Sequence, residues 1–200
     1  MLDDRVHLSM SDALDVPADV LVVEDSGWLT ATRGLAGLVA ARYPALRALR
    51  EQAVAEHGGS FPLGAAMAFT INDDEYTLRA VVWAVTWTYP QPTAQHAHDR
   101  VRATPLDVAA ATRNALHQAA IIAATHVVLP ALGSRLDYHV LPPTPKKLPR
   151  YVMGAAQLVA MQQALVASPI QQVTLSVSQR DYGIFSELLG RRHDEVATDE

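Results

Sequence analysis

The order of short apolar strands and helical segments constrains the fold of this chain more than any other feature of its sequence. Residues 19–24 form a β-branched run after Pro17, which is typical of a buried strand. Residues 126–132 and 172–177 have the same character, and helical segments separate the three runs. Strands that alternate with helices predict a three-layer α/β/α sandwich with a mixed central sheet. In such folds, ligands bind at the carboxyl ends of the strands.

The helical segments carry apolar residues three and four positions apart. The first of them contains Pro44, which predicts two helical pieces that meet there. Thr104 is followed by Pro105 and Asp107, an order typical of a helix N-terminus with Thr104 as the N-cap. The expected helices are residues 35–55 (in two pieces), 105–125, 151–166 and 181–189.

Two extended runs, residues 65–71 and 78–87, flank a polar turn at 72–75 and predict an antiparallel hairpin. Residues 89–104 and the proline-rich stretch 133–148 are expected to be loops. The sequence alone assigns no role to the proline-rich part of that second loop.

No linker divides the 200 residues, half of which are apolar, so we expect one domain over residues 1–190 and a polar tail over 191–200. The net charge of −5 and the lack of a long basic run argue against a dedicated nucleic-acid binder. The absence of cysteine excludes disulfide scaffolds, cysteine nucleophiles and thiolate metal sites. Without a targeting segment or about 20 consecutive apolar residues, we expect a cytoplasmic protein that does not bind membranes.

The segment Ser11-Asp12-Ala13-Leu14, followed by the strand of residues 19–24, resembles the opening turn and strand of macro domains. Macro domains bind ADP-ribose and related nucleotides. The resemblance implies that Asp12, with its neighbour Ala13, contacts the adenine of such a ligand, and a carboxylate can accept a hydrogen bond from an exocyclic amine. The alternative is that Asp12 only caps a turn.

The segment after that strand resembles the family's first ligand-binding loop. Ser26 stands where the family has its catalytic asparagine, and Thr32-Arg33-Gly34 replaces a run of glycines. The resemblance implies that Ser26, Arg33, Gly34 and Leu35 contact the ligand. The family's glycines let backbone N–H groups come close to a diphosphate, and Arg33 would supply a positive charge instead.

A second loop follows the strand end Leu129-Pro130-Ala131, which closely matches the family's pattern. The resemblance implies that residues of this loop face the phosphate oxygens of the ligand. The candidates are Gly133, Ser134, Arg135 and Leu136. The alternative for Arg135 is an exposed loop charge.

Two further groups of residues have competing interpretations. His96, His98 and Asp99 resemble a fragment of a metal site, but no second cluster accompanies them, so a solvated loop is favoured and neither a metal nor a cofactor is expected. Trp83 and Trp87 lie at the end of a predicted strand. Core packing is favoured for Trp83, whereas Trp87 fits either the core or stacking on a base or ribose.

The sequence leaves three functional hypotheses. The favoured one is a divergent macro-like domain that binds ADP-ribose or a related nucleotide. The second is a hydrolase of ADP-ribosyl bonds or of ADP-ribose phosphate, in which Glu24 and Asp25 are the nearest carboxylates, although neighbours in a strand point to opposite faces. The third is a degenerate fold that acts as an interaction module. The oligomeric state stays open.

Overall fold

The computed structural model describes residues 4–71, 78–91, 100–133 and 148–190. Within them the chain forms a seven-stranded sheet in the order β1-β7-β6-β2-β4-β3, with β5 paired to β4. The strands are β1 (Val6–Ser9), β2 (Val20–Ser26), β3 (Ala66–Thr70), β4 (Ala80–Thr88), β5 (Val101–Arg102), β6 (His126–Pro130) and β7 (Gln172–Ser176). The helices are α1 (Gly34–Arg42), α2 (Leu46–His57), α3 (Pro105–Ile121), α4 (Leu148–Leu165) and α5 (Gln179–Leu188).

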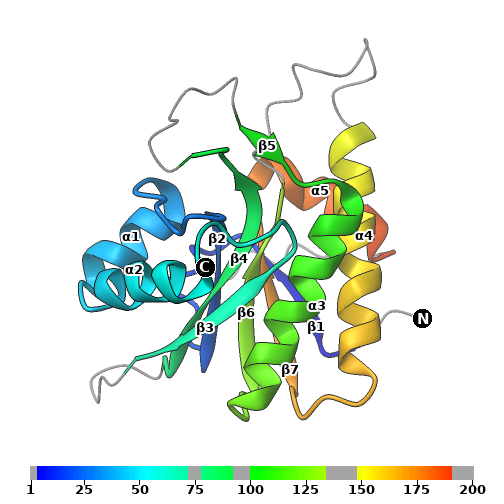
Figure 1. Cartoon of the computed structure of the whole chain (residues 1–200). Coiled ribbons are helices and arrows are strands. Elements are labelled where there is room, and N and C mark those ends of the chain that lie inside the picture. The colour runs from blue at the N-terminus through cyan, green and yellow to red at the C-terminus, as the bar shows by residue number, and fades with distance from the viewer. Residues whose placement is uncertain (1–3, 72–77, 92–99, 134–147, 191–200) are drawn as a thin grey trace.

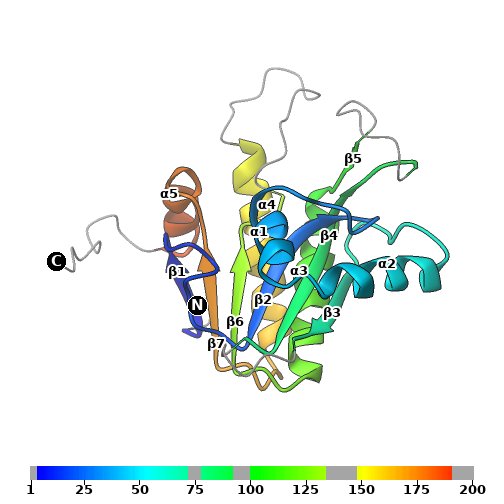
Figure 2. The ribbon, with the colours of Figure 1, turned by 90° about the vertical axis from the view of Figure 1, so that its left-hand side faces the viewer.

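The sheet is mixed and helices cover both of its faces, which confirms the predicted three-layer α/β/α sandwich. Figures 1 and 2 show α1 and α2 on one face, α3 and α4 on the other, and α5 beside β1. Strands β1, β7, β6, β2 and β4 run parallel, whereas β3 and β5 are antiparallel to β4.

Each face of the sheet has its own core, because side chains alternate along a strand. In β2, Val20 and Val22 pack into the core under α3 and α4, whereas Leu21 and Val23 pack into the core under α1 and α2. Trp83 is fully buried in the second core, as its sequence context favoured.

Several local predictions are confirmed. The helical region splits at Pro44 into α1 and α2, and β3 pairs with β4 as an antiparallel hairpin. The turn expected at 72–75 lies outside the described residues. Helix α3 begins with a capping box in which the Thr104 hydroxyl and the Asp107 carboxylate satisfy each other's backbone N–H groups.

Two expectations are wrong in detail, and one strand is missing from the predicted elements. The loop predicted for 89–104 contains β5, whose two residues pair with the end of β4. Helix α3 ends at Ile121 rather than near residue 125, because Ala123 turns the chain with a φ of +53°. Strand β1 was not expected from its four residues, and it forms beside β7.

The helices were also compared with the length and apolar character that a membrane crossing requires. Across the four described ranges, no helix combines the two.

Candidate functional site

A cleft of about 1050 Å³ lies at the carboxyl ends of the parallel strands. Residues that follow β1, β2, β6 and β7, and residues at the end of β4, line it. This is the edge of the sheet where the fold class predicted a ligand. Six of the predicted site residues come together there: Asp12, Ala13, Ser26, Arg33, Gly34 and Leu35.

The remaining predicted residues belong to the second loop. Gly133 does not line the cleft, and its backbone N–H donates a hydrogen bond to Oε1 of Glu24 at 2.7 Å. Ser134, Arg135 and Leu136 lie outside the described residues, as do His96, His98 and Asp99. Contact of any of them with a ligand stays a prediction.

Asp12 is exposed and borders the cleft. Its Oδ1 accepts a hydrogen bond from the backbone N–H of Leu14 at 3.0 Å, and its carbonyl oxygen accepts one from Asp15. Asp12 therefore forms the turn that its alternative interpretation predicted, and it also faces the space where a ligand would lie. The two roles are compatible because the turn uses one carboxylate oxygen.

Ser26 ends β2 and is buried at the floor of the cleft. Its hydroxyl lies 3.3 Å from the Thr30 hydroxyl, so the two side chains share a hydrogen bond across the loop. Gly27 follows, and a Cβ at this position would lie 2.4 Å from the carbonyl oxygen of Phe61. Only glycine lets the chain leave the strand so close to the segment after α2.

A buried ion pair anchors the loop that follows β2. Asp25 is fully buried, and its Oδ2 accepts a hydrogen bond from the Arg50 guanidinium at 3.0 Å. Its Oδ1 accepts hydrogen bonds from the N–H groups of Ser26 at 2.6 Å and Ala31 at 2.9 Å. Arg50 lies over the ring of Trp83, 4.3 Å from its centroid, and also donates to the carbonyl of Leu29.

Burial acts on both partners of this pair. Burial raises the pKa of Asp25, because it penalises the carboxylate, and Arg50 opposes that effect. Burial likewise lowers the pKa of Arg50, and Asp25 opposes the change. The pair therefore depends on its internal hydrogen bonds, and these connect α2 to the loop that shapes the cleft.

The N-terminus of α1 opens into the cleft. Gly34 begins the helix with a φ of +62°, a conformation that suits glycine. The side chain of Arg33, the N-cap residue, makes no capping hydrogen bond. Gly34, Leu35 and Ala36 line the cleft, and the first N–H groups of a helix have no acceptor within the helix.

Four arginines line the cleft: Arg33, Arg100, Arg150 and Arg180. Arg100 donates to the Tyr89 hydroxyl at 2.9 Å, and its guanidinium lies 5.5 Å from the Trp87 ring centroid. Trp87 therefore faces the cleft rather than the core. Of these four arginines, only Arg33 is among the site residues predicted from the sequence.

Three carboxylates line the same cleft. Besides Asp12 these are Asp181, which lies 3.5 Å from Arg150, and Glu24, whose Oε1 accepts a hydrogen bond from the Thr86 hydroxyl at 2.6 Å. Glu24 faces the cleft and Asp25 the opposite core, as the alternation of side chains along a strand requires. In the described part of the chain, no three histidine or acidic side chains gather into a metal site.

Sequence signals for the missed residues were weak. Arg150 and Arg180 lie in α4 and α5, far along the chain. Only the parallel pairing of β2 with β6, and of β6 with β7, brings the carboxyl ends of these strands to one edge. Arg50 lies within the helical region predicted for residues 35–55, and no spacing rule links it to Asp25.

Searches against protein-family models and against curated proteins gave no match. Solved structures do match. The Oceanobacillus iheyensis macrodomain with ADP has a TM-score of 0.69 and 21% identity, covering 95% of this chain and 94% of that chain. A mutant of the same macrodomain with ADPR has a TM-score of 0.68 and 19% identity, covering 95% and 96%. The macrodomain of Mycobacterium tuberculosis DarG has a TM-score of 0.62 and 15% identity, covering 86% and 97%.

These likenesses cover nearly the whole chain at low sequence identity, and they concern its architecture. They confirm the predicted resemblance at the level of the fold. The chain has the macrodomain fold.

Proposed function

We propose that the cleft binds ADP-ribose or a related nucleotide, with the diphosphate at the N-terminus of α1. The observation that carries the proposal is the opening of this helix end into the cleft beside Arg33. Backbone N–H groups and the helix dipole favour an anion at such a position. The guanidinium of Arg33 adds a full positive charge next to them.

The extent of the cleft supports a long ligand. Asp12 follows β1, and Trp87 lies near the end of β4, four strands further along the parallel part of the sheet. Neighbouring strands lie about 4.8 Å apart, so this distance is roughly 19 Å. An adenine at Asp12 would leave room for a diphosphate at α1 and a further sugar toward β2 and β4.

Two matching structures support the ligand class. The Oceanobacillus iheyensis macrodomain has been solved with ADP and, as a mutant, with ADPR, the usual abbreviation of ADP-ribose. Both ligands contain adenine and a diphosphate, the two groups that Asp12 and the α1 N-terminus suit.

Isothermal titration with ADP-ribose tests the proposal. Asp12→Asn keeps an oxygen for the Leu14 N–H but loses the charge, so we expect about tenfold weaker binding than in the unmodified protein. Asp15→Asn is the matched control, because Asp15 is exposed and does not line the cleft. No binding heat with the unmodified protein at millimolar ADP-ribose would contradict the proposal.

Hydrolysis of an ADP-ribosyl bond and a role as an interaction module stay predictions. Ser26, at the position of the family's catalytic asparagine, shares its hydroxyl with Thr30. Incubation with an ADP-ribosylated test protein, with release of ADP-ribose as the readout, distinguishes turnover from binding alone.

A further inference from the structure

The turn after β6 uses its own backbone amides internally. The N–H of Leu132 donates to Oε1 of Gln157 at 3.0 Å, and the N–H of Gly133 donates to Oε1 of Glu24 at 2.7 Å. Gln157, which is fully buried in α4, also donates to the carbonyl of Pro130 at 2.8 Å. Two backbone amides of this turn, those of Leu132 and Gly133, are therefore already bound to side chains and are not offered to a phosphate.

Glu24 is fixed in this position by a second donor. The Thr86 hydroxyl, which is fully buried in β4, donates to the same Oε1 at 2.6 Å. The carboxylate thus connects β2, β4 and the turn after β6, and it lines the cleft. Moving it aside would break two short hydrogen bonds and leave a buried hydroxyl without this acceptor.

The cleft therefore has two unlike halves. At the α1 end, a ligand would meet helix N–H groups and Arg33. At the β2 end, it would meet the carboxylate of Glu24, which already holds the amide of Gly133. A carboxylate repels a phosphate and accepts hydrogen bonds from hydroxyl groups, and both effects are stronger in a partly buried site than in water.

We infer that Glu24 determines specificity: it selects nucleotides whose diphosphate is followed by an unmodified sugar with free hydroxyls, and it disfavours those that carry a phosphate on that sugar. This inference rests on the proposed function, since it concerns the same cleft. Discrimination arises both from a favourable contact with the right ligand and from repulsion of the wrong one.

The test compares two ligands by isothermal titration: ADP-ribose, and ADP-ribose with a phosphate on its terminal ribose. The unmodified protein is expected to bind ADP-ribose at least tenfold more tightly. In Glu24→Gln, an amide oxygen still accepts from Thr86 and Gly133, but the charge is lost. This variant is expected to reduce the preference about tenfold, chiefly by tighter binding of the phosphorylated ligand.

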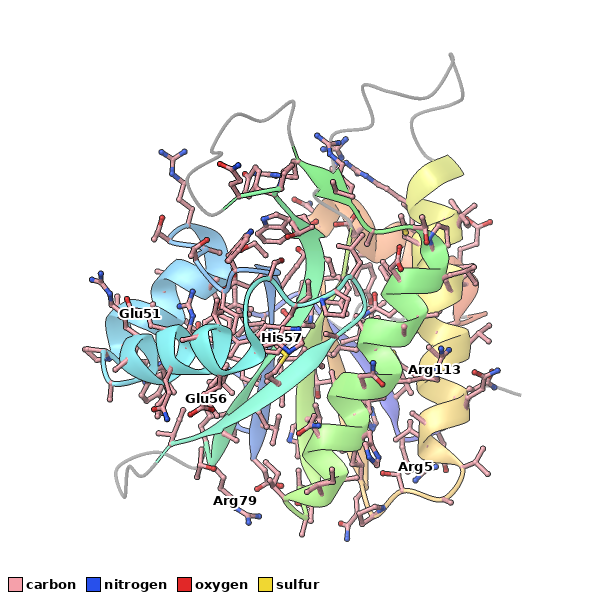
Figure 3. The ribbon with its side chains drawn as sticks, viewed as in Figure 1. Arg5, Glu51, Glu56, His57, Arg79 and Arg113 are labelled. Atoms are coloured by element: carbon pink, nitrogen blue, oxygen red, sulfur yellow. The ribbon has the colours of Figure 1, made fainter. Side chains whose placement is uncertain are left out.

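Glu56→Gln is the matched control, because Glu56 is an exposed residue of α2 (Figure 3) and does not line the cleft. It removes the same net charge and is expected to leave the preference unchanged. A second measurement needs no variant: raising the salt concentration screens the repulsion, so the preference of the unmodified protein is expected to shrink.

The outcomes separate the two proposals. If the unmodified protein binds neither ligand, the proposed function and this inference both fail. If it binds both ligands equally well, or if Glu24→Gln and Glu56→Gln have the same effect on the preference, the inference fails while nucleotide binding stands. Should Glu24→Gln not fold, a preference that is insensitive to salt overturns the inference.

Discussion

At the scale of single residues, the ion pair of Asp25 and Arg50 shows how the core supports the cleft. Both residues are buried on the α1 and α2 side of the sheet, and neither lines the cleft. The Asp25 carboxylate nevertheless holds the N–H groups of Ser26 and Ala31, which belong to the cleft loop. A buried charge with its partner removed is costly, so this pair is a sensitive point of the fold.

We expect Arg50→Met to lower the free energy of unfolding by about 3 kcal/mol or more, because it leaves the buried Asp25 carboxylate without its counter-charge. Urea denaturation monitored by circular dichroism measures the change. Arg47→Met is the matched control, since Arg47 pairs with Glu51 on the exposed side of α2, where Figure 3 labels Glu51. The control is expected to cost less than about 0.5 kcal/mol.

Adding Asp25→Asn to Arg50→Met removes the unpaired charge and keeps an oxygen for the two loop N–H groups. The double variant is therefore expected to be more stable than Arg50→Met alone. If the losses of unfolding free energy caused by Asp25→Asn and by Arg50→Met simply add in the double variant, lost packing on Trp83, rather than charge, dominates.

At the scale of elements, polar side chains connect the amino ends of the parallel strands. Oδ2 of Asp19, just before β2, accepts hydrogen bonds from the Thr125 N–H, the Thr125 hydroxyl and the His126 N–H at 2.6 to 2.9 Å. Nε2 of His126 lies 2.8 Å from the Thr174 hydroxyl of β7. These bonds fix the starts of β2, β6 and β7 relative to one another.

Both titrating groups in this network make the folded chain more stable at neutral pH than at acidic pH. Burial lowers the pKa of His126, and the nearby Asp19 only partly opposes it. Burial raises the pKa of Asp19, but its hydrogen bonds from His126 and Thr125 outweigh burial, so the net pKa lies below its ordinary value of 3.8. Asp19 therefore stays ionised at pH 5, and the pH dependence that this network contributes between pH 7 and pH 5 comes from His126.

We expect the free energy of unfolding to fall as the pH drops from 7 to 5, because the unfolded chain binds a proton at this histidine more readily than the folded chain. His126→Gln is expected to flatten the decline. Urea denaturation at pH 5, 6 and 7 measures it, and His117→Gln, at an exposed position of α3, is the matched control. An equal flattening by both variants would assign the effect to net charge instead of to the buried site.

Elements differ in how well the sequence predicts them. Strand β2 and helix α3 follow from local signals, namely a β-branched run and a Thr104-to-Asp107 capping box. Strand β1 has the polar residues His7 and Ser9 among only four, and it is a strand because the backbone of β7 pairs with it. Such pairing depends on residues about 165 positions away, which no local pattern contains.

At the scale of the whole molecule, the cleft exists because five parallel strands end at one edge. The sequence predicted this edge, and it predicted Asp12, Ser26 and Gly34 because the resemblance assigned residues to the ends of recognisable strands. These three residues line the cleft, and their contact with a ligand stays a prediction. It did not predict Arg100 or Arg180, which reach the cleft only when the sheet order is known.

A ligand that binds the folded chain but not the unfolded chain raises the melting temperature. ADP-ribose at 100 times its dissociation constant would add about 2.7 kcal/mol of stability, and for a domain of this size each kcal/mol raises Tm by roughly 2–4 °C. Differential scanning fluorimetry is therefore expected to show a rise of about 5–10 °C. Adenosine, which lacks the diphosphate, is the control, and an equal rise with adenosine would contradict phosphate binding at α1.

The helix end that opens into the cleft is made of main chain, and this affects how the site can diverge. Substituting a side chain cannot remove the N–H groups at the start of α1, so affinity for an anion would be inherited with the fold even among chains that share few residues. Glu24, by contrast, is a single side chain that one codon change replaces. In such a site the general ligand class would persist across long divergence, while the choice among its members could change in one step.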